Sequence, residues 1–453
     1  MKMFGTNGIR GVANGYLCSE LALKVGKAIA TVLGPGPVAM ARDTRVSSPM
    51  VSAALSAGLM SMGVDVVDLG MVPTPALQYY VRTHSDVSGG VMVTASHNPP
   101  EFNGIKCISA DGTECSPEEE AAIEDAYDGD LACTCWDRIG TIRHHDDAGE
   151  EYIDAVVSKV DVDAIRSAGL RVCLDCANGA AVSTTPLLLR RLGVRTITIN
   201  GNPDGFFPGH DSEPTEENLD DLKRMVRELD VDLGIAHDGD ADRCVFVTGG
   251  GNYVPGDQSL ALLGSLMVRA NGGGLVVTTV ATSSLVEDVV TSAGGTVAYT
   301  AVGSPVVARR MMEDSGLFGG EENGGLIFSD HQFCRDGAMA VARMLEAVVR
   351  YGPLEDQVSA LPRYHTVKGA VMCTDEVKGV ITDLIAARHP DLRMNRLDGL
   401  RIDYDDGWVL LRPSGTEPKY RIYSESRDRE VAERRAAEFR AEFEEIASGF
   451  GGS

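Results

Sequence analysis

The alternation of short apolar runs with longer amphipathic stretches is the feature that most constrains the fold of this chain. Runs typical of β-strands lie near residues 38–41, 64–69 and 90–94, and helix-like stretches at 19–33 and 49–62 lie between them. Strands that alternate with helices favour layered domains in which helices cover the faces of a sheet. We therefore expect an α/β protein.

The same alternation continues along most of the chain. We expect further strands at residues 170–176, 194–200, 231–236, 275–279 and 296–300. We expect further helices at residues 215–229 and from about Ser116, Asp257, Ser283, Ser304 and Asp336. The last part differs, because its predicted strands come in succession at residues 370–373, 400–403, 407–411 and 420–424, before a charged amphipathic helix at 428–446. That order is typical of an α+β domain.

The length of 453 residues is too great for a single hydrophobic core. The stretch at 129–149 has mixed polarity and no clear period, and a glycine run at 249–251 interrupts the pattern again. With the change of order near residue 365, these breaks predict four domains. They span residues 1–150, 151–252, 253–364 and 365–453.

Composition excludes several classes of function. The formal net charge of −25 argues against nucleic acid or an anionic membrane surface as a partner. No run reaches the roughly 18 apolar residues of a membrane span, and the first residues do not resemble a signal peptide. Ten cysteines without regular spacing are typical of reduced thiols. We therefore expect a cytoplasmic protein with neither a membrane nor a nucleic-acid partner.

A serine directly follows one of the predicted strands. The apolar run 90–93 leads into Thr94-Ala95-Ser96-His97-Asn98-Pro99-Pro100, where the prolines prevent the strand from continuing. The Ser96 hydroxyl is thereby held at a strand end, and a base, a metal or a preset charge field could make it a nucleophile. A structural interpretation stays open, in which Ser96 and Asn98 cap the local backbone.

Three carboxylates follow a second strand at every second position. The run 231–236 ends in His237-Asp238-Gly239-Asp240-Ala241-Asp242-Arg243. Alternate spacing lets Asp238, Asp240 and Asp242 converge on one cation, and an all-oxygen set favours Mg²⁺ or Ca²⁺ over zinc. Three carboxylates after an apolar run repel one another unless a cation neutralises them, which favours a metal site over a solvated acidic turn.

A basic loop lies near the C-terminus. It reads Arg412-Pro413-Ser414-Gly415-Thr416-Glu417-Pro418-Lys419, and Arg421 follows shortly after. Two hydroxyls, flexible backbone amides and flanking cations form an anion-binding pattern, in which an arginine can grip a phosphate with two nitrogens. An exposed polar hairpin loop is the competing interpretation.

Weaker patterns complete the set of candidate site residues. Glu321 and Asn323 lie in a glycine-rich loop whose carboxylate and amide groups suit sugar hydroxyls, although a flexible turn fits equally well. Arg10, in a glycine-rich opening segment, could reach a phosphate. Lys106 could stabilise charge or carry a proton. No Walker A sequence and no G-x-G-x-x-G opens a helix, so ATP-dependent and dinucleotide-dependent functions lack their main support.

Together these motifs resemble the α-D-phosphohexomutase family over essentially the whole chain. In order, they read F-G-T-N-G-I-R-G, T-A-S-H-N-P, D-G-D-A-D-R, G-E-E-N-G-G and R-P-S-G-T-E-P. The resemblance implies four domains around a central cleft, with three related α/β domains and a smaller C-terminal α+β domain. The opening and closing motifs look most like those of phosphoglucosamine mutases, whereas Asn323 and Gly325 replace the usual serine and histidine of that sugar loop.

The resemblance also implies a role for each candidate residue. Ser96 would carry a phosphoryl group, and Mg²⁺ would be bound by Asp238, Asp240 and Asp242 together with the group on Ser96. His97, Lys106, Arg10 and Arg243 would surround the transferring group. Glu321 and Asn323 would bind the sugar. The other phosphate would be held by Arg412, Ser414, Gly415, Thr416 and Arg421.

The implied reaction interconverts a hexose 6-phosphate and a hexose 1-phosphate through phosphoserine and a bound hexose 1,6-bisphosphate, which also serves as activator. Glucosamine phosphate is the expected substrate, and mannose and glucose phosphates are the alternatives within the family. A Mg²⁺-dependent phosphatase that uses Ser96 is the alternative from another enzyme class, and an ion- or sugar-binding protein is the non-catalytic one. A phosphosugar is the expected partner, and a homodimer is allowed for.

Overall fold

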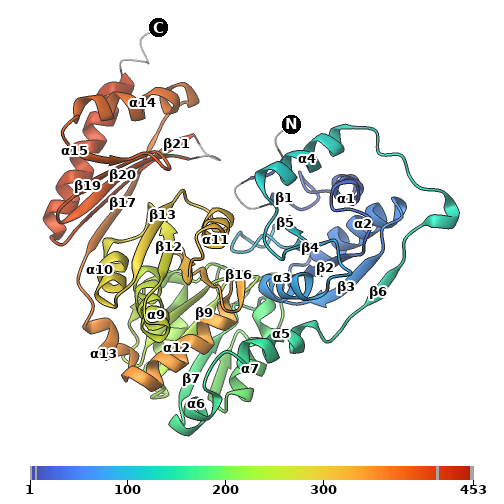
Figure 1. Ribbon diagram of the computed structural model, residues 1–453, viewed down its shortest axis with the longest axis horizontal. Coiled ribbons are helices and arrows are strands. Elements are labelled where there is room, and N and C mark those ends of the chain that lie inside the picture. The colour runs from blue at the N-terminus through green and yellow to red at the C-terminus, as the bar shows by residue number, and fades with distance from the viewer. Residues whose placement is uncertain (1–2, 6–7, 415–417, 449–453) are drawn as a thin grey trace.

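The computed structural model describes residues 3–5, 8–414 and 418–448, and its strands form four sheets (Figure 1). We call the parts of the chain built on these sheets units I to IV, in chain order. Units I and IV lie on opposite sides of the molecule in Figure 1, with units II and III between them.

Unit I is built on a six-stranded sheet in the order β1-β5-β4-β2-β3-β6. Its elements are β1 (Ile9–Val12), α1 (Ser19–Val32), β2 (Val38–Arg42), α2 (Ser48–Ser61), β3 (Val66–Met71), α3 (Thr74–Thr83), β4 (Gly89–Val93), β5 (Phe102–Ser109), α4 (Pro117–Asp128), the 3-10 helix η1 (Trp136–Arg138) and β6 (Ile142–His144). Helix α4 starts as predicted, because Ser116 and Glu119 form a reciprocal capping box.

Unit II is built on a five-stranded sheet in the order β11-β10-β9-β7-β8. Its elements are α5 (Ala148–Val157), α6 (Val162–Ala168), β7 (Arg171–Asp175), η2 (Ala180–Ser183), α7 (Thr185–Arg191), β8 (Arg195–Ile199), η3 (Glu216–Leu219), α8 (Asp220–Glu228), β9 (Leu233–His237), β10 (Cys244–Thr248) and β11 (Tyr253–Val254). All residues of β9 and β10 are buried, as expected for strands that are covered on both faces.

Unit III is built on a five-stranded sheet in the order β13-β12-β14-β15-β16. Its elements are α9 (Gly256–Asn271), β12 (Leu275–Thr279), α10 (Ser284–Ser292), β13 (Thr296–Thr300), α11 (Ser304–Glu313), β14 (Phe318–Gly320), β15 (Leu326–Phe328), β16 (Gln332–Arg335), α12 (Gly337–Tyr351) and α13 (Leu354–Ser359).

The first three units share one topology. In each, a central strand (β2, β7 or β12) pairs in parallel with a neighbour on both sides. The last of these parallel strands then turns through a short loop into an antiparallel partner, in the pairs β4–β5, β9–β10 and β14–β15. These three equivalent loops contain Ser96, the aspartate triplet and Glu321, so one repeated structural position carries three of the predicted motifs.

Unit IV has an antiparallel five-stranded sheet in the order β17-β21-β20-β19-β18. Its elements are β17 (His365–Met372), α14 (Asp375–Arg388), β18 (Arg393–Asn395), β19 (Leu400–Tyr404), β20 (Gly407–Pro413), β21 (Lys419–Ser426) and α15 (Arg429–Ser448). The basic loop joins β20 to β21. The predicted fold class, three related α/β units and one α+β unit, is confirmed.

The hydrophobic cores join units I to III closely and leave unit IV largely separate. One continuous cluster joins units I, II and III, and includes Tyr80, Leu188 and Phe318. Unit IV has a separate core around Ile381, Tyr420 and Phe443. A small cluster of Val280, Ala281, Trp408 and Leu410 joins unit IV to unit III. Unit IV is therefore attached by much less buried apolar surface than the other three units share.

Some local predictions need correction. The predicted helix at 215–229 is a 3-10 turn, η3, followed by the shorter helix α8. Helices α3 and α14, which the sequence reasoning did not predict, are present. β6, inside the stretch that showed no period, pairs with β3 of unit I. β11 pairs with β10 and so belongs to the sheet of unit II. Among the described residues, the structure has no helix with the length and apolarity that a membrane crossing needs.

Candidate functional site

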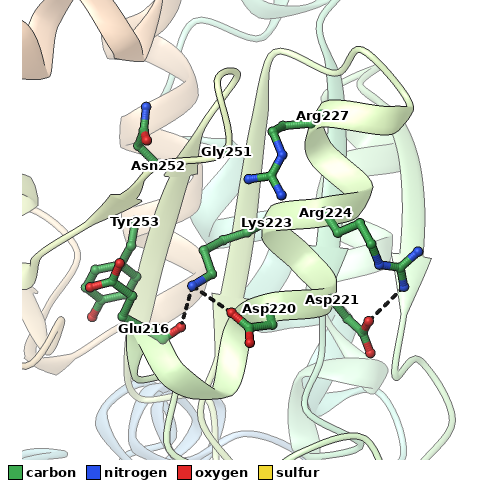
Figure 2. Close-up of a pocket in the computed structure, with 9 residues that line it drawn as sticks. All are labelled: Glu216, Asp220, Asp221, Lys223, Arg224, Arg227, Gly251, Asn252 and Tyr253. Carbon is green, nitrogen blue, oxygen red and sulfur yellow. Dashed lines mark hydrogen bonds and ion pairs between the residues drawn. The ribbon is translucent and has the colours of Figure 1, made fainter.

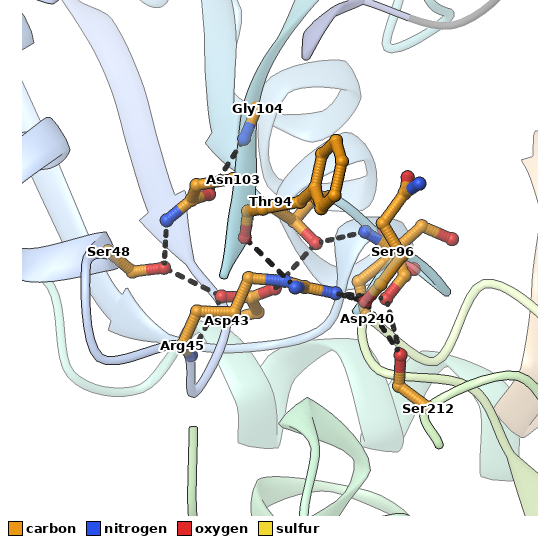
Figure 3. A network of polar contacts seen from close by, with 12 residues as sticks. Asp43, Arg45, Ser48, Thr94, Ser96, Asn103, Gly104, Ser212 and Asp240 are labelled. Atoms are coloured by element: carbon orange, nitrogen blue, oxygen red, sulfur yellow. Dashed lines mark hydrogen bonds and ion pairs between the residues drawn. The ribbon is translucent and has the colours of Figure 1, made fainter. Parts of the chain in front are cut away.

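A network of buried polar residues in unit I holds the Ser96 loop in a strained conformation (Figure 3). Ser96 has a positive φ of 52°, which is uncommon for a residue other than glycine, and its side chain is fully buried. The Ser96 amide donates to Thr94 Oγ1 at 2.8 Å, and Thr94 donates to Asp43 at 2.7 Å. Arg45, paired with Asp43 at 3.0 Å, donates to the Ser96 carbonyl at 2.8 Å. This buried network fixes the direction of the Ser96 hydroxyl.

The aspartate loop of unit II meets the serine loop of unit I. Ser96 Oγ donates to Asp238 Oδ2 at 2.8 Å, although the two residues are 142 positions apart. Gly239 permits this approach, because a Cβ at that position would lie 2.5 Å from the Ser96 carbonyl oxygen. One carboxylate oxygen from each of Asp238, Asp240 and Asp242 lies within 4.8 Å of the others, and all three residues are buried.

Two cations and a hydroxyl occupy one side of this triplet. Lys106 Nζ lies 2.7 Å from Asp240 Oδ2 and 3.1 Å from Asp242 Oδ2. Arg335 reaches Asp242 Oδ2 at 2.5 Å, and Thr74 donates to Asp240 Oδ2 at 2.6 Å. Burial would lower the pKa of Lys106, but the two carboxylates outweigh that effect and raise it, so the ammonium stays charged.

The opposite oxygens of the triplet fit a hard cation. The Oδ1 atoms of Asp240 and Asp242 are buried and accept no hydrogen bond from any described residue. Burial, with repulsion from Asp242 and Asp240, raises the pKa of Asp238 well above its usual value. A buried carboxylate oxygen without a partner is costly, and a divalent ion with oxygen ligands would relieve both the unsatisfied oxygens and the repulsion. The donor set therefore fits Mg²⁺.

Positive charges surround the Ser96 loop on its open side. Arg10 on β1 donates to Asn98 Oδ1 at 2.8 Å, and Arg243 pairs with Glu213 at 3.2 Å. His97 Nδ1 lies 3.3 Å from Ser96 Oγ. Burial and the charges of Arg243, Arg10 and Arg335 lower the pKa of His97 to about 2. Its imidazole is therefore neutral and only weakly basic.

A single cavity of about 550 Å³ is lined by residues of all four units. Of the predicted site residues, it brings together Arg10, His97, Arg243, Glu321, Asn323, Arg412, Ser414 and Arg421. Lys106 and the aspartate triplet are buried rather than part of the lining, and Arg335 and His97 connect them to it. Gly415 and Thr416 lie outside the described residues.

The loop between β14 and β15 presents its carboxylate to this cavity. Glu321 accepts from the Gly303 amide at 3.1 Å and pairs with Arg335 at 3.5 Å. Burial raises the pKa of Glu321 above its usual value, although Arg335 opposes the effect. Asn323 Oδ1 accepts from the Gly325 amide at 3.1 Å, so this loop is an ordered turn.

The far end of the cavity is formed by the hairpin of unit IV. Arg412 on β20 and Arg421 on β21 are directly opposed in the antiparallel register, so both side chains project from the same face. Two guanidinium groups side by side suit a phosphate, which each can contact with two nitrogens. Arg412 Nε also pairs with Asp398 Oδ2 at 2.5 Å.

A second hollow, of about 600 Å³, lies beside α8 on unit II and shares no lining residue with this cavity (Figure 2). Two of its three basic groups are paired locally: Lys223 with Asp220 at 2.9 Å, and Arg224 with Asp221 at 2.7 Å. The charges of Lys223 and Arg224 are therefore neutralised by neighbours on the same helix. The chemistry-bearing groups converge on the four-unit cavity.

The sequence reasoning missed several residues of this site. Arg335, Thr74, the Asp43–Arg45 pair and Asp398 are all within it or directly behind it. Arg335 left a weak signal, since it is a charged residue at a strand end just before the N-cap Asp336 of α12. Thr74 resembles an ordinary helix start next to proline, and nothing in its neighbourhood points to Asp240.

Comparison with known proteins agrees with the fold and the site. Four family models match in order, described as phosphoglucomutase/phosphomannomutase α/β/α domains I, II and III and C-terminal domain. They cover residues 1–132, 150–251, 255–364 and 370–442.

Similar proteins cover nearly the full chain. A probable phosphoglucosamine mutase of Methanopyrus kandleri is 44% identical over 98% of this chain and 97% of its own length. A phosphoglucomutase/phosphomannomutase of Thermococcus kodakarensis is 42% identical, over 95% and 96%. The crystal structure of a phosphoglucomutase/phosphomannomutase family protein from Burkholderia thailandensis superimposes with a TM-score of 0.87 at 27% identity, covering 96% of each chain.

The four units, their shared cavity and these relatives define the class: the protein is an isomerase that moves a phosphoryl group within a sugar phosphate. The chain belongs to the phosphoglucomutase/phosphomannomutase family, the α-D-phosphohexomutases, and resembles its phosphoglucosamine mutases.

Proposed function

We propose that the protein interconverts hexose 6-phosphate and hexose 1-phosphate, with Ser96 as the phosphoryl carrier and a hexose 1,6-bisphosphate as bound intermediate. One observation carries this proposal. A single cavity connects the Ser96 and aspartate loops, through His97 and Arg335, to the Arg412–Arg421 pair of unit IV. A molecule with phosphate at each end fits a cavity with an anion-handling group at each end. In this proposal the four domains follow the boundaries given by the sequence.

Mg²⁺ belongs to this proposal. Asp238, Asp240 and Asp242 would hold it together with an oxygen on Ser96, and when bound it would neutralise charge on the phosphoryl oxygens. Lys106, Arg10 and Arg243 add fixed positive charge around the same place. Because these groups are already oriented in a buried site, they need little rearrangement when charge develops.

The transfer itself is symmetric. In the first half, the bond between phosphorus and Ser96 Oγ breaks as phosphorus bonds to a sugar hydroxyl oxygen, and the hydroxyl proton passes to a base. In the second half, the bond between the other phosphorus of the bisphosphate and its sugar oxygen breaks as that phosphorus bonds to Ser96 Oγ, and the base returns the proton to the sugar oxygen. The carboxylate of Glu321 in the cavity, whose pKa is raised, is the candidate proton acceptor. Neutral His97, 3.3 Å from Ser96 Oγ, is a weak base and can instead donate a hydrogen bond to a phosphoryl oxygen.

Full burial of Ser96 supports a mutase over a phosphatase, because water must be kept from the phosphoserine. A bisphosphate intermediate must also turn round without leaving. Unit IV, with its own core and a small apolar contact with unit III, is suited to closing over it. Hexose phosphates are charged and do not cross membranes unaided, so we place the reaction in the cytoplasm.

We propose glucosamine phosphate as the preferred substrate. Several relatives, including that of Methanopyrus kandleri, are described as probable phosphoglucosamine mutases. Glu321, the one carboxylate among the described residues that line the cavity, could pair with an ammonium group on the sugar. Glucose and mannose phosphates carry a hydroxyl at the corresponding carbon and would lack this charge pair.

The test is a side-by-side turnover assay with glucosamine 6-phosphate, glucose 1-phosphate and mannose 1-phosphate, with Mg²⁺ and glucose 1,6-bisphosphate present. We expect isomerisation of all three without net phosphate release, and the highest kcat/KM for glucosamine 6-phosphate. A higher kcat/KM for glucose or mannose phosphate would assign the alternative specificity. Stoichiometric release of inorganic phosphate would replace the mutase with a phosphatase.

A further inference from the structure

The arginine at the far end of the cavity is itself held by a carboxylate. Arg412 Nε lies 2.5 Å from Asp398 Oδ2, and each side chain is 17% exposed. The contact uses Nε, and so leaves the two terminal nitrogens of the guanidinium for a ligand. A partly buried charge pair of this kind restricts the rotamers of a long side chain that would otherwise sample many.

The backbone places Asp398 at this position. The next residue, Gly399, has a positive φ of 75° and lies against β20, where a Cβ would be 2.2 Å from the Leu411 carbonyl oxygen and 2.9 Å from Arg412 Cα. Leu400 then pairs with Leu411 in the sheet. Only glycine permits so close an approach in this conformation, so the Asp398-Gly399 turn is built directly onto the segment that carries Arg412.

The same carboxylate oxygen also reaches unit III. Asp398 Oδ2 accepts from the Val302 amide at 3.0 Å. The next amide, of Gly303, donates to Glu321 Oε1 at 3.1 Å. Asp398 therefore joins the distal arginine to the two consecutive peptides that hold the proposed sugar-binding carboxylate.

We propose that Asp398 is a positioning residue for the distal phosphate. It orients the Arg412 guanidinium for phosphate and fixes Arg412 relative to the Val302–Gly303 peptides. The distal phosphate and the sugar are thereby bound at a fixed distance from each other. This inference rests on the proposed function of Arg412 and Glu321. It assigns to Asp398 a role that acts through Arg412 and involves no contact with the reacting atoms.

Electrostatics alone predicts the opposite effect of removing Asp398 on phosphate binding, and this difference makes the proposal testable. A carboxylate beside a phosphate site lowers the local positive potential, so its removal would tighten phosphate binding if charge were all that mattered. If Asp398 orients Arg412, its removal loosens the guanidinium and weakens binding, in spite of the gain in positive charge.

The experiment measures KM and kcat for glucose 1-phosphate in the Asp398→Asn variant. We expect KM to rise about tenfold with kcat changed less than about twofold, because a distal grip acts on ground state and transition state alike. Asp403→Asn is the matched control. Asp403 pairs with Arg401 at 2.8 Å, and Arg401 also contacts unit III through the Val280 carbonyl. That control changes an arginine pair at the same junction without touching Arg412, and its KM should stay within about twofold.

A double-mutant cycle separates positioning from a general structural role. In an Arg412→Ala background, which should itself raise KM, Asp398→Asn is expected to add less than about twofold. A full tenfold effect in that background, an equal effect of Asp403→Asn, or tighter binding in Asp398→Asn would each overturn the proposal.

Two further measurements keep the proposal falsifiable. If Asp398→Asn does not fold, as judged by thermal unfolding, Asp398→Glu keeps the charge and displaces it by one methylene, and the same rise in KM is expected. Calorimetric binding of glucose 1,6-bisphosphate needs no turnover. If the wild-type protein binds it but isomerises no sugar phosphate, the proposed function fails, and a tenfold loss of binding in Asp398→Asn would still support the positioning role.

Discussion

The two ends of the cavity handle charge in different ways. At the proposed reacting end, Ser96, Lys106 and the aspartate triplet are at most 1% exposed, and loops of units I and II lie in direct backbone contact at Gly239. At the far end, Arg412 is 17% exposed and belongs to a unit with its own core. The first end is preorganised, whereas the second belongs to a unit that shares little buried apolar surface with the rest.

This difference indicates that the two ends of the cavity have different roles. Phosphoryl transfer requires fixed geometry and exclusion of water, which the shared core of units I to III provides. In the proposed reaction, binding, release and turning of the intermediate would require a binding site that can adjust, and a unit with its own core and a small junction with unit III is suited to provide it. Changes at the reacting end should therefore act on kcat, and changes at the far end on KM or on the junction.

The largest effect is expected from Ser96→Ala, which removes the proposed phosphoryl carrier. We expect kcat to fall by at least about four orders of magnitude while the protein stays folded, with a thermal unfolding midpoint lowered only by the loss of the hydrogen bond to Asp238. The measurements are turnover and mass spectrometry of the isolated protein. Ser56→Ala, a buried serine on α2 that bonds the Ser52 carbonyl, is the control. Near-normal turnover in Ser96→Ala would contradict the assignment of Ser96 as phosphoryl carrier, and with it the distinction between the two ends of the cavity.

Asp240→Asn should come next, with a fall in kcat of about two to three orders of magnitude and a weaker dependence on Mg²⁺. The reason is the loss of one anionic oxygen from the triplet, while Lys106 and Thr74 lose a charged partner. Activity is measured against Mg²⁺ concentration. Asp221→Asn, an aspartate of unit II paired with Arg224 on the surface, should leave the curve unchanged. An unchanged Mg²⁺ requirement in Asp240→Asn would contradict the assigned ion site.

Thr74→Val tests whether unit I helps to shape the ion site of unit II. Thr74 donates to Asp240 Oδ2 at 2.6 Å, and its amide donates to the Asp240 carbonyl at 3.1 Å. Loss of a hydrogen bond to a charged group corresponds to about 1.5–3 kcal/mol. We expect about a tenfold higher Mg²⁺ concentration for half-activation. Thr83→Val, at the opposite end of α3, serves as control. If both variants need the same Mg²⁺ concentration for half-activation, Thr74 does not help to preorganise the ion site.

The smallest effect concerns pH at the junction of units III and IV. Asp257, at the start of α9, has a pKa raised to about 7 by burial and by repulsion from Glu322. A carboxyl whose pKa is raised in the folded state stabilises the fold below its unfolded pKa of 3.8, and this contribution is lost as pH rises towards 7. Asp257→Asn should therefore reduce the fall in Tm between pH 5 and pH 8 by a few degrees. Parallel Tm curves for the two proteins would contradict this assignment.

Sequence periodicity determined much of the architecture, because it reports on local backbone preference and burial. It predicted α/β order, the change to α+β order after residue 365, and strand ends at Ser96 and Asp238. Helix α8 was overestimated because its first turn, η3, is wound as a 3-10 helix while keeping helical spacing of apolar residues. Helix α3 was missed because it begins among prolines and threonine, which read as loop.

What the chain determined by itself is the set of reactive groups and their placement at strand ends, because both follow from neighbouring residues. What only the tertiary structure decided is which groups meet. Thr74 and Asp240 are 166 residues apart, and Arg335 and Asp242 are 93 apart. Asp398 touches Val302 across a junction of two units. Such contacts depend on how whole sheets pack against one another. That packing is set by the burial of side chains from distant parts of the chain, so the residues next to each contact in the sequence do not predict it.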